Sequence, residues 1–531
     1  MKKTAFLFLA LLLAALSACK GKPAGGGEAD AGSGERHLII AANPDYESFD
    51  PGIAYEPYGS TVIHACYDNL FEFQGSLDNL APAAAEGYEI SADGLTYTFT
   101  LRPGIRFAGG NPLTSADVKW SFERAINLKG NAAFMAEGIT GIETPDDATV
   151  IIRLRETDPS FPIELAFVFF SIMDSKAATE QGATNAPDAD VTDTARTWLD
   201  THSVGSGPYQ IETYTPKVEV VLGRNPNYWG PAPYYDRITI STVMDSNTQL
   251  MMLRAGDADI AFNLSAEQVK SIAGVPGITI LDAQSLTTSF LLMNRDPAIG
   301  GPVADPRVQA AIRLALDYGG IQAVAGPGMS TPMAPFPLGL LGSLPPGDVA
   351  GYPKTAEAKA LLAEAGYAGG FSTRLYVPTS TVVGVELVTL AQKLQNDLAA
   401  IGITAELVPE NVTISLESYR TGRQSLGLWY WSPDYPDNNS QLAFLPGNSV
   451  GLRANWTADQ NPALAALGKR AATEIDNAKR VELFTQIQRA MIEDTPFAML
   501  LQHTSQYAVR SGLTGADYLE LYQLDLKRIA E

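Results

Sequence analysis

Segments with helical spacing and segments with strand-like spacing alternate irregularly along this chain, and that mixture most narrows the folds open to it. Residues 387–401 place leucines and one isoleucine on a single helical face before Gly402, which predicts a helix that ends in a turn. Residues 97–101 alternate apolar side chains with threonines, as a half-buried strand does. Strands and helices do not follow a strict βαβ order, so the sequence predicts α/β lobes with mixed sheets.

Several other segments carry helix start or stop signals. Thr114 and Asp117 have the spacing of a capping box. A helix that follows Asp245 should stop at Gly256 and lead into a short strand, and Pro306 should stand in the first turn of another helix. No short-period repeat is visible, which disfavours a solenoid or a propeller.

Size and charge limit the architecture and the partners. The 531 residues exceed the roughly 250–300 residues at which a single core stops growing, so two or three domains are expected. The formal net charge of -22 repels nucleic acid and anionic membrane surfaces. We therefore expect no nucleic acid partner.

The N-terminus has the pattern of an export signal. Residues 1–18 combine Lys2 and Lys3 with an apolar run and small residues, and they are predicted to be a signal peptide. The segment that ends at Cys19 resembles the bacterial lipobox, in which the cysteine is lipidated and becomes the mature N-terminus. Residues 19–35 then form a Gly- and Ala-rich flexible tether. The alternative is ordinary signal cleavage beside an incidental cysteine.

One other cysteine, Cys66, lies in an apolar run and is predicted to be a buried small side chain rather than half of a disulfide. No later stretch is long and apolar enough to cross a bilayer. The lipid on Cys19 is therefore the only expected membrane attachment.

Motifs for cofactor or metal chemistry are missing. The sequence has no phosphate-cradling or dinucleotide-binding glycine motif, and its histidines lack metal-ligand spacing, so no cofactor and no metal are expected. Residues 447–451 match the G-x-S-x-G pattern of a hydrolase nucleophile, with His503 downstream. A serine hydrolase using Ser449 stays open as a minor alternative, and a loop serine is the preferred interpretation.

Seven stretches follow one another in a characteristic order. They are "YDNLFEF", "ADGLTYTFTLRPGIRFAGGNPLTSADVKWSFERAI", "VGSGPYQIETY", "RNPNYWGPAPYYDRITI", "LRAGDADI", "MNRDPAIGGPVADPRVQAAIRLALDY" and "WSPDYPD". In this order they resemble the solute-binding proteins of peptide-type ABC importers, the family 5 or extracellular peptide-binding class.

The resemblance implies an α/β fold of the periplasmic-binding-protein type, with two lobes, mixed sheets and an extra subdomain in the larger lobe (class C-like). Lobe I is expected at residues 36–286, with the inserted subdomain at about 70–204. Lobe II is expected at residues 287–502, and residues 503–531 return to lobe I. The lobes would close on a ligand at a hinge.

The resemblance also implies a receptor rather than an enzyme. Such a protein captures a peptide or peptide-like solute and delivers it to a membrane permease. We expect a monomer that is held by its lipid in the bacterial periplasm or at the cell surface.

The candidate ligand-binding residues lie in and after an aromatic run. In peptide-binding members a motif like Trp-x-x-Asp supplies the aspartate that meets the ligand's α-amino group, and here this motif is Trp431 to Asp434. Strand alternation places Trp429 and Trp431 on one face, while Pro433 ends the strand. Asp434, Trp431, Trp429 and Tyr435 are the expected ligand-binding set, and no catalytic or metal-binding residue is expected.

One departure from the family leaves the ligand open. Dipeptide-binding members use a lobe II arginine for the ligand carboxylate, whereas residues 375–387 contain none, and Arg374 stands just before them. A strict dipeptide receptor is therefore disfavoured, and a longer peptide or another amine-bearing solute remains open. The alternatives are a receptor of the same fold for an opine, an oligosaccharide or a nickel chelate, and a sensor or chaperone that feeds no permease.

Overall fold

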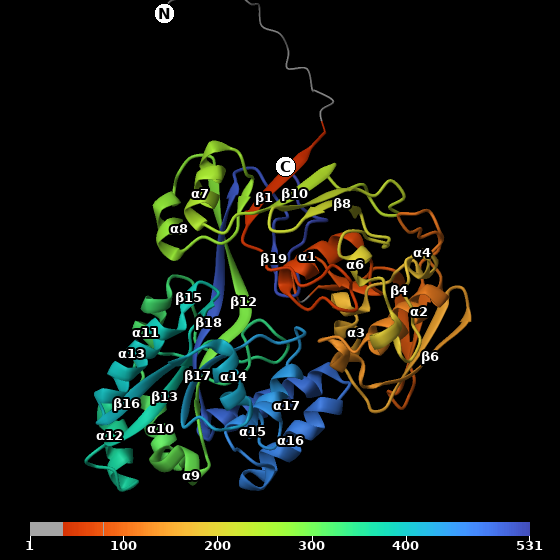
Figure 1. The fold of residues 1–531 in the computed structure, drawn as a ribbon. Helices are drawn as coiled ribbons and strands as arrows, with labels where there is room; N and C mark the ends of the chain where they lie inside the picture. The colour runs from red at the N-terminus through yellow and green to blue at the C-terminus, as the bar shows by residue number, and fades with distance from the viewer. Residues whose placement is uncertain (1–34, 78) are drawn as a thin grey trace, which may run out of the picture. The chain divides into compact units, whose positions relative to one another are not determined.

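The computed structural model describes residues 35–77 and 79–531. Within those residues its largest element is a ten-stranded mixed sheet (Figure 1). In spatial order the strands are β16 (Ile403–Glu410), β13 (Phe371–Pro378), β17 (Leu426–Trp431), β12 (Ile278–Met293), β18 (Phe497–Arg510), β11 (Ile260–Ala261), β1 (His37–Ala42), β10 (Arg237–Thr242), β9 (Glu219–Arg224) and β8 (Tyr209–Thr215).

Two long antiparallel strands, β12 and β18, run through the middle of this sheet and join the upper and lower parts of the molecule in Figure 1. They have 16 and 14 residues. Their pairing changes register between Gln284 and Thr288, where the residues between have no partner in the ladder. Such an irregularity bends a strand locally.

A second, antiparallel sheet lies in the N-terminal half of the chain. Its spatial order is β4 (Ala85–Ile90), β5 (Thr96–Leu101), β7 (Thr149–Leu154) and β6 (Ile139–Asp146). In β5, Tyr97, Phe99 and Leu101 are buried, as their alternation predicted. Short two-stranded pairs complete the strands that the structure describes: β2 (Phe71–Phe73) with β3 (Leu80–Pro82), β14 (Thr381–Val382) with β15 (Val385–Glu386), and β19 (Tyr518–Leu519) with β20 (Gln523–Leu524).

Helices cover the sheets and lie in the connections between their strands. The longer ones are α1 (Pro57–Cys66), α2 (Ser115–Leu128), α7 (Ser246–Ala255), α8 (Ala266–Ile272), α10 (Pro306–Ala315), α11 (Tyr318–Ala325), α12 (Thr355–Glu364), α13 (Leu387–Ala399), α14 (Val412–Arg420), α16 (Pro462–Thr473) and α17 (Asn477–Glu493). The shorter ones are α3 (Phe161–Glu164), α4 (Ser175–Glu180), α5 (Ala189–Thr192), α6 (Arg196–Leu199), α9 (Pro297–Gly300) and α15 (Ser449–Arg453).

The predicted helix signals are confirmed. The Thr114 side chain and Asp117 form a reciprocal capping box at the start of α2. Gly256 ends α7 with φ of +80°, a conformation that costs glycine little because it has no Cβ. On α13, Leu387, Leu390, Leu394 and Leu398 are buried on one face.

The buried apolar side chains form separate cores in the two parts of the sheet. One core combines residues between Leu38 and Phe262 with residues between Tyr507 and Ile529. Two others use residues between Phe290 and Leu501. The residues from β12 onward therefore form hydrophobic cores of their own, and the chain returns to the first core at the end of β18.

Cys66 is free and buried at the end of α1, as predicted. In the described part of the chain, no helix has the length and apolar character needed to cross a membrane. The predicted signal peptide, Cys19 and most of the tether lie outside the described residues.

Candidate functional site

A cavity of about 590 Å³ lies in the described part of the molecule. Its walls come from residues 134–139, from residues 154–164 between β7 and α3, and from residues 431–449 after β17, with Ala472 and Thr473 of α16 closing one side. Segments far apart in the sequence thus meet around one space. The volume falls within the roughly 300–1,000 Å³ of typical small-molecule sites.

Asp434 lies in this cavity, in the loop that follows β17. Its carboxylate accepts a hydrogen bond from the hydroxyl of Tyr55. Burial raises the pKa of Asp434 above its ordinary value, and the Tyr55 hydrogen bond opposes that rise. Tyr55 is itself held between the edges of Phe134 and Phe167, at ring-centroid distances of 6.4 and 6.2 Å. The carboxylate is therefore presented to the cavity from a fixed position.

Trp431 and Tyr435 also line the cavity. Trp431 packs edge-on against Phe444 at 5.6 Å between ring centroids, and its indole Nε1 has no hydrogen-bond partner among the described residues. Burial raises the pKa of Tyr435 well above its ordinary value, and the charges of Glu164 and Asp158 add to the rise.

Trp429, the fourth predicted residue, is not among the residues that line this cavity. It is only 3% exposed. Its ring stacks on Tyr419 with 4.2 Å between centroids, and its Nε1 donates to Oε1 of Gln424 at 2.7 Å. Trp429 and Trp431 pack in the same core, as strand alternation predicted. Of the two, only Trp431, the last residue of β17, lines the cavity.

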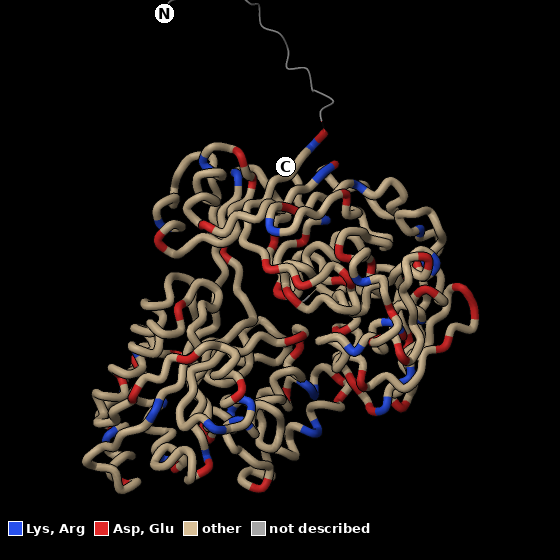
Figure 2. The backbone as a smooth tube through the Cα atoms, viewed as in Figure 1, with Lys and Arg blue, Asp and Glu red and all other residues tan. Residues whose placement is uncertain are grey.

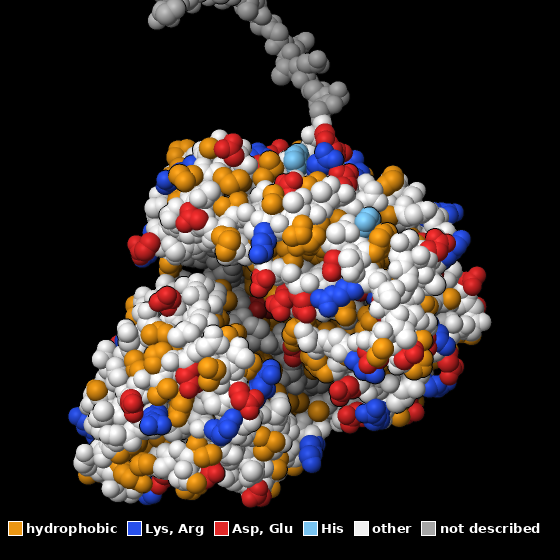
Figure 3. Space-filling view, in the orientation of Figure 1, with side chains coloured by type: hydrophobic (Ala, Val, Ile, Leu, Met, Phe, Trp, Pro, Cys, Tyr) orange, Lys and Arg blue, Asp and Glu red, His pale blue; other side chains and the backbone are white. Residues whose placement is uncertain are grey.

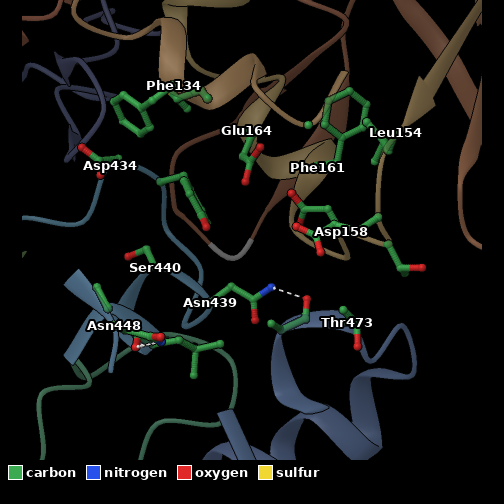
Figure 4. A pocket seen from close by; sticks show the side chains of 18 of the residues that line it. Phe134, Leu154, Asp158, Phe161, Glu164, Asp434, Asn439, Ser440, Asn448 and Thr473 are labelled. Carbon is green, nitrogen blue, oxygen red and sulfur yellow. Dashed lines mark hydrogen bonds between the residues drawn. The ribbon is translucent and has the colours of Figure 1, made fainter. Parts of the chain in front are cut away.

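Two acids that the sequence analysis did not single out belong to the cavity wall. Asp158 lies just before α3 and Glu164 is its last residue, and Figure 4 shows their carboxyl groups turned toward the space above Asn439. Glu164 is 5% exposed. Burial raises its pKa well above the ordinary value, and the neighbouring charges of Asp158 and Asp437 raise it further.

The loop after Asp434 is anchored by a buried ion pair. Asp437 accepts a hydrogen bond from the backbone N–H of Asn439 at 2.8 Å, and it pairs with Arg480 of α17 at 2.5 Å. Both side chains are 2% exposed. Asn439 donates from Nδ2 to the Ser160 hydroxyl at 3.3 Å, while its Oδ1 has no partner within the described residues.

The charge around the cavity is one-sided. Its lining includes Glu156, Asp158, Glu164 and Asp434 and no lysine, arginine or histidine among the described residues. Figure 2 shows acidic positions along the edge of the upper right part that faces α16 and α17. In Figure 3 the same face is hollowed in its middle, with acidic side chains at the upper edge of the hollow. This arrangement favours a positively charged guest.

The described residues around the cavity do not have the arrangement of a metal site or of a hydrolase nucleophile elbow. No group of three or more His, Cys, Asp or Glu side chains is placed to hold a metal ion in the described ranges. Ser449 lines the cavity at the start of α15, but the residues before it form a 3₁₀ helix (Ser440–Phe444) rather than a strand. His503 hydrogen-bonds Ser289 at 2.7 Å, and no hydrogen bond joins it to Ser449 among the described residues. A nucleophile elbow needs a strand before the serine.

Arg374 does not reach the cavity either. It stands on β13 with its side chain exposed, and its Nε lies 3.5 Å from Oε2 of Glu406 on the neighbouring strand β16. No arginine of the described residues therefore lines the cavity to receive a carboxylate.

Comparison with known proteins places the chain in a family. Residues 79–451 match the sequence profile of the bacterial extracellular solute-binding proteins, family 5. The chain is 27% identical over 518 residues to di/tripeptide-binding protein 2 of Pseudomonas aeruginosa, covering 93% of this chain and 94% of that protein. It is also 27% identical over 528 residues to heme-binding protein A of Haemophilus influenzae, covering 94% and 93%.

A solved structure confirms the fold. The structure of HbpA2 from Haemophilus parasuis superposes with a TM-score of 0.81 at 24% identity and covers 93% of this chain and 99% of that one. The chain thus has the two-lobed α/β fold of periplasmic binding proteins, with a large mixed sheet. Together the matched profile, the relatives and the fold show that the chain belongs to family 5 of the bacterial extracellular solute-binding proteins, the receptors of ABC importers.

Proposed function

We propose that this protein is the lipid-anchored receptor of an ABC importer and captures a peptide or peptide-like solute with a free amino group. The observation that carries the proposal is Asp434, a carboxylate fixed in the wall of a 590 Å³ cavity with a hydroxyl, not a cation, as its partner. An ammonium group supplies the missing positive charge. Closure around it would exclude water and strengthen the pair.

The aromatic residues take different parts in this proposal. Trp431 and Tyr435 contact the solute, because both line the cavity beside Asp434. Trp431 makes this contact with its ring, because its indole Nε1 is buried. Trp429 supports the strand end from within the core rather than touching the solute.

We further propose a lobe I of residues 36–286 and 503–531 and a lobe II of residues 287–502, with about 70–204 as the inserted subdomain. The separate cores support this division. The change of register in β12 lies at the proposed crossing. There Glu520 accepts hydrogen bonds from Ser285, from the backbone N–H of Leu286 and from Thr287, at 2.8 to 3.0 Å. A bend held by side chains suits a hinge.

One relative is named for di/tripeptide binding and another for heme binding, so we compare a peptide and heme as the solute of this cavity. Heme carries two propionate carboxylates, which the acids of this cavity would repel, and no described base lines the cavity to neutralise them. A peptide ammonium is attracted by the same acids. Receptors for opines, oligosaccharides or nickel chelates remain the alternatives of the same fold.

The proposed setting is the bacterial periplasm or the cell surface, where a lipid anchors the protein to a membrane. Cys19 would carry the lipid, residues 20–35 would be the tether, and a monomer would deliver its solute to a membrane permease. A strain that lacks this protein distinguishes the transport role from a sensor or chaperone role, because only the loss of a transport receptor produces an uptake defect.

The direct test is to identify the solute. Mass spectrometry of material released from the purified protein should find amine-bearing peptides, and adding them back at a hundredfold their Kd should stabilise the fold by about 2.7 kcal/mol. Small-angle scattering should show a smaller radius of gyration with the solute bound. Release of only anionic or neutral solutes would contradict the proposal. Ester or peptide hydrolysis that disappears in Ser449→Ala would support the hydrolase instead.

A further inference from the structure

The segment from β7 to α3 gives the cavity a second acidic feature, which is distant in sequence from the Asp434 loop and contacts it through Ser160 and Asn439. Asp158 lies beside Glu164, and both carboxyl groups face the cavity (Figure 4). The backbone N–H and the hydroxyl of Ser160 donate to Oδ1 of Asp158 at 2.9 and 2.6 Å, which fixes that carboxylate in place. The pair is therefore built into the wall rather than carried on a mobile side chain.

Several buried acids of this protein have a basic partner: Asp50 and Asp193 with Arg124, and Asp437 with Arg480. Asp117 and Asp174, which are buried without a base, accept hydrogen bonds from neutral donors instead. Glu164 differs from both groups, because it is buried beside the carboxyl of Asp158 and no lysine, arginine or histidine of the described residues pairs with either acid. A buried carboxyl beside a second carboxyl is costly to ionise without a cation. Without a guest, the raised pKa of Glu164 favours its protonated form beside Asp158, and a cationic guest can take the place of that proton.

We infer that Asp158 and Glu164 form a second cation-binding subsite, so that the preferred solute is a short peptide with a lysine or arginine side chain in addition to its free amino group. This inference rests on the proposed function, in which Asp434 receives the amino group. It narrows the solute to a molecule with two positive charges.

The surroundings of the pair suit an organic cation. Phe161 and Leu154 line the cavity next to the acids and offer apolar surface to the methylene stem of a long basic side chain. Asn439 also lines the cavity, and its Nδ2 donates to the Ser160 hydroxyl that holds Asp158. The acids are not grouped with a third His, Cys, Asp or Glu in metal-binding geometry within the described ranges. An ammonium or guanidinium group therefore fits better than a bare metal ion.

The test uses the full-length protein and an equimolar library of di-, tri- and tetrapeptides in which Lys, Arg, Met, Gln and Glu occur equally at each position. Wild type, Glu164→Gln and Asp158→Asn are incubated with the library, and bound peptides are identified by mass spectrometry after gel filtration. Glu89→Gln is the matched control, because Glu89 is an exposed acid on β4 that does not line the cavity. Circular dichroism shows which variants fold, and either cavity variant suffices.

In wild type and Glu89→Gln, the bound amount of a peptide with Lys or Arg after its first residue should exceed that of the matching Met peptide by about tenfold or more. Both cavity variants should still retain peptides but lose this preference. Peptides retained by wild type without enrichment of Lys or Arg, or an enrichment that survives in both variants, would overturn the inference and leave the proposed function standing. No peptide retained by wild type would overturn both.

Discussion

The hydroxyl of Tyr55 donates a hydrogen bond to the carboxylate of Asp434, although the two residues are 379 positions apart in the sequence. Tyr55 immediately precedes Glu56, the N-cap of α1, whereas Asp434 belongs to the loop after β17. This hydrogen bond gives the cavity acid a neutral partner that an incoming ammonium can join. It also stabilises the ionised form of the acid, which is the form that binds a cation.

Replacing Tyr55 with phenylalanine should shift the pH dependence of solute binding. Burial raises the pKa of Asp434, and the Tyr55 hydrogen bond lowers it, so Tyr55→Phe should raise this pKa further. Binding of an amine-bearing peptide should then be lost at a higher pH than in wild type. Calorimetry over a pH series measures the shift, with Tyr58→Phe as control because the Tyr58 hydroxyl bonds Asn263. An unshifted or lowered acid limb would contradict the role of the hydrogen bond.

Glu164 should make the protein without solute less stable as the pH rises. Its pKa in the folded protein is raised well above the ordinary 4.5, first by burial and then by Asp158 and Asp437. The folded state then holds a proton that the unfolded state releases, so this stabilisation is complete below about 4.5 and is lost as pH rises through the raised value.

Glu164→Gln should remove that loss, so the Tm difference between variant and wild type should grow in favour of the variant with increasing pH. Thermal unfolding at a series of pH values, in parallel with Glu89→Gln, measures the difference. A difference that does not change with pH would show that Glu164 is not protonated in the folded protein.

The pair between Arg480 and Asp437 should be necessary for the loop that carries Asp434. Arg480→Met leaves a buried carboxylate without its cation, which typically costs about 3–5 kcal/mol. Adding Asp437→Asn should recover part of this loss, because the stranded charge is then gone. Urea unfolding of wild type, both single variants and the double variant gives the coupling energy. Additive effects of the two substitutions would show that the pair contributes nothing as a pair.

Cys19→Ser should abolish lipidation. Radiolabelled fatty acid should enter wild type but not the variant, and the variant should leave the membrane fraction or remain unprocessed. The control is Cys66→Ser, since Cys66 is buried in the folded domain and should not affect labelling. A mature wild-type N-terminus at another residue, without lipid, would contradict the proposed anchor.

Local sequence patterns predicted much of the secondary structure. The capping box of Thr114, the stop at Gly256 and the leucine face of α13 depend on neighbours within a few residues, and the structure confirms each. The long strand β12 was not predicted, because its second half is buried on both faces and lacks the alternation of a half-exposed strand. Its apolar run does not distinguish a strand from a buried helix.

Of the residues that line the cavity, the sequence singled out only those in or beside a motif. Asp434, Trp431 and Tyr435 lie together at the cavity, but Asp158 and Glu164 come from a distant segment whose acids look like ordinary surface residues in the sequence. Only the fold brings them to the cavity and buries Glu164. Trp429 was predicted from its position near Trp431, but it packs on Tyr419 in the core. The sequence does not show how far along the strand the cavity extends.

The central claim is that the Asp434 carboxylate binds a positive group of the solute, and calorimetry on Asp434→Ala and Asp434→Asn tests it most directly. Truncating one partner of a buried charge pair costs about 2–5 kcal/mol, so the affinity of Asp434→Ala for an amine-bearing peptide should fall at least about thirtyfold. Asp434→Asn keeps the shape but loses the charge and should also bind weakly. Acetylating the peptide's amino group should weaken binding to wild type strongly and to Asp434→Ala little. Unchanged affinity in a well-folded Asp434→Ala would contradict the account.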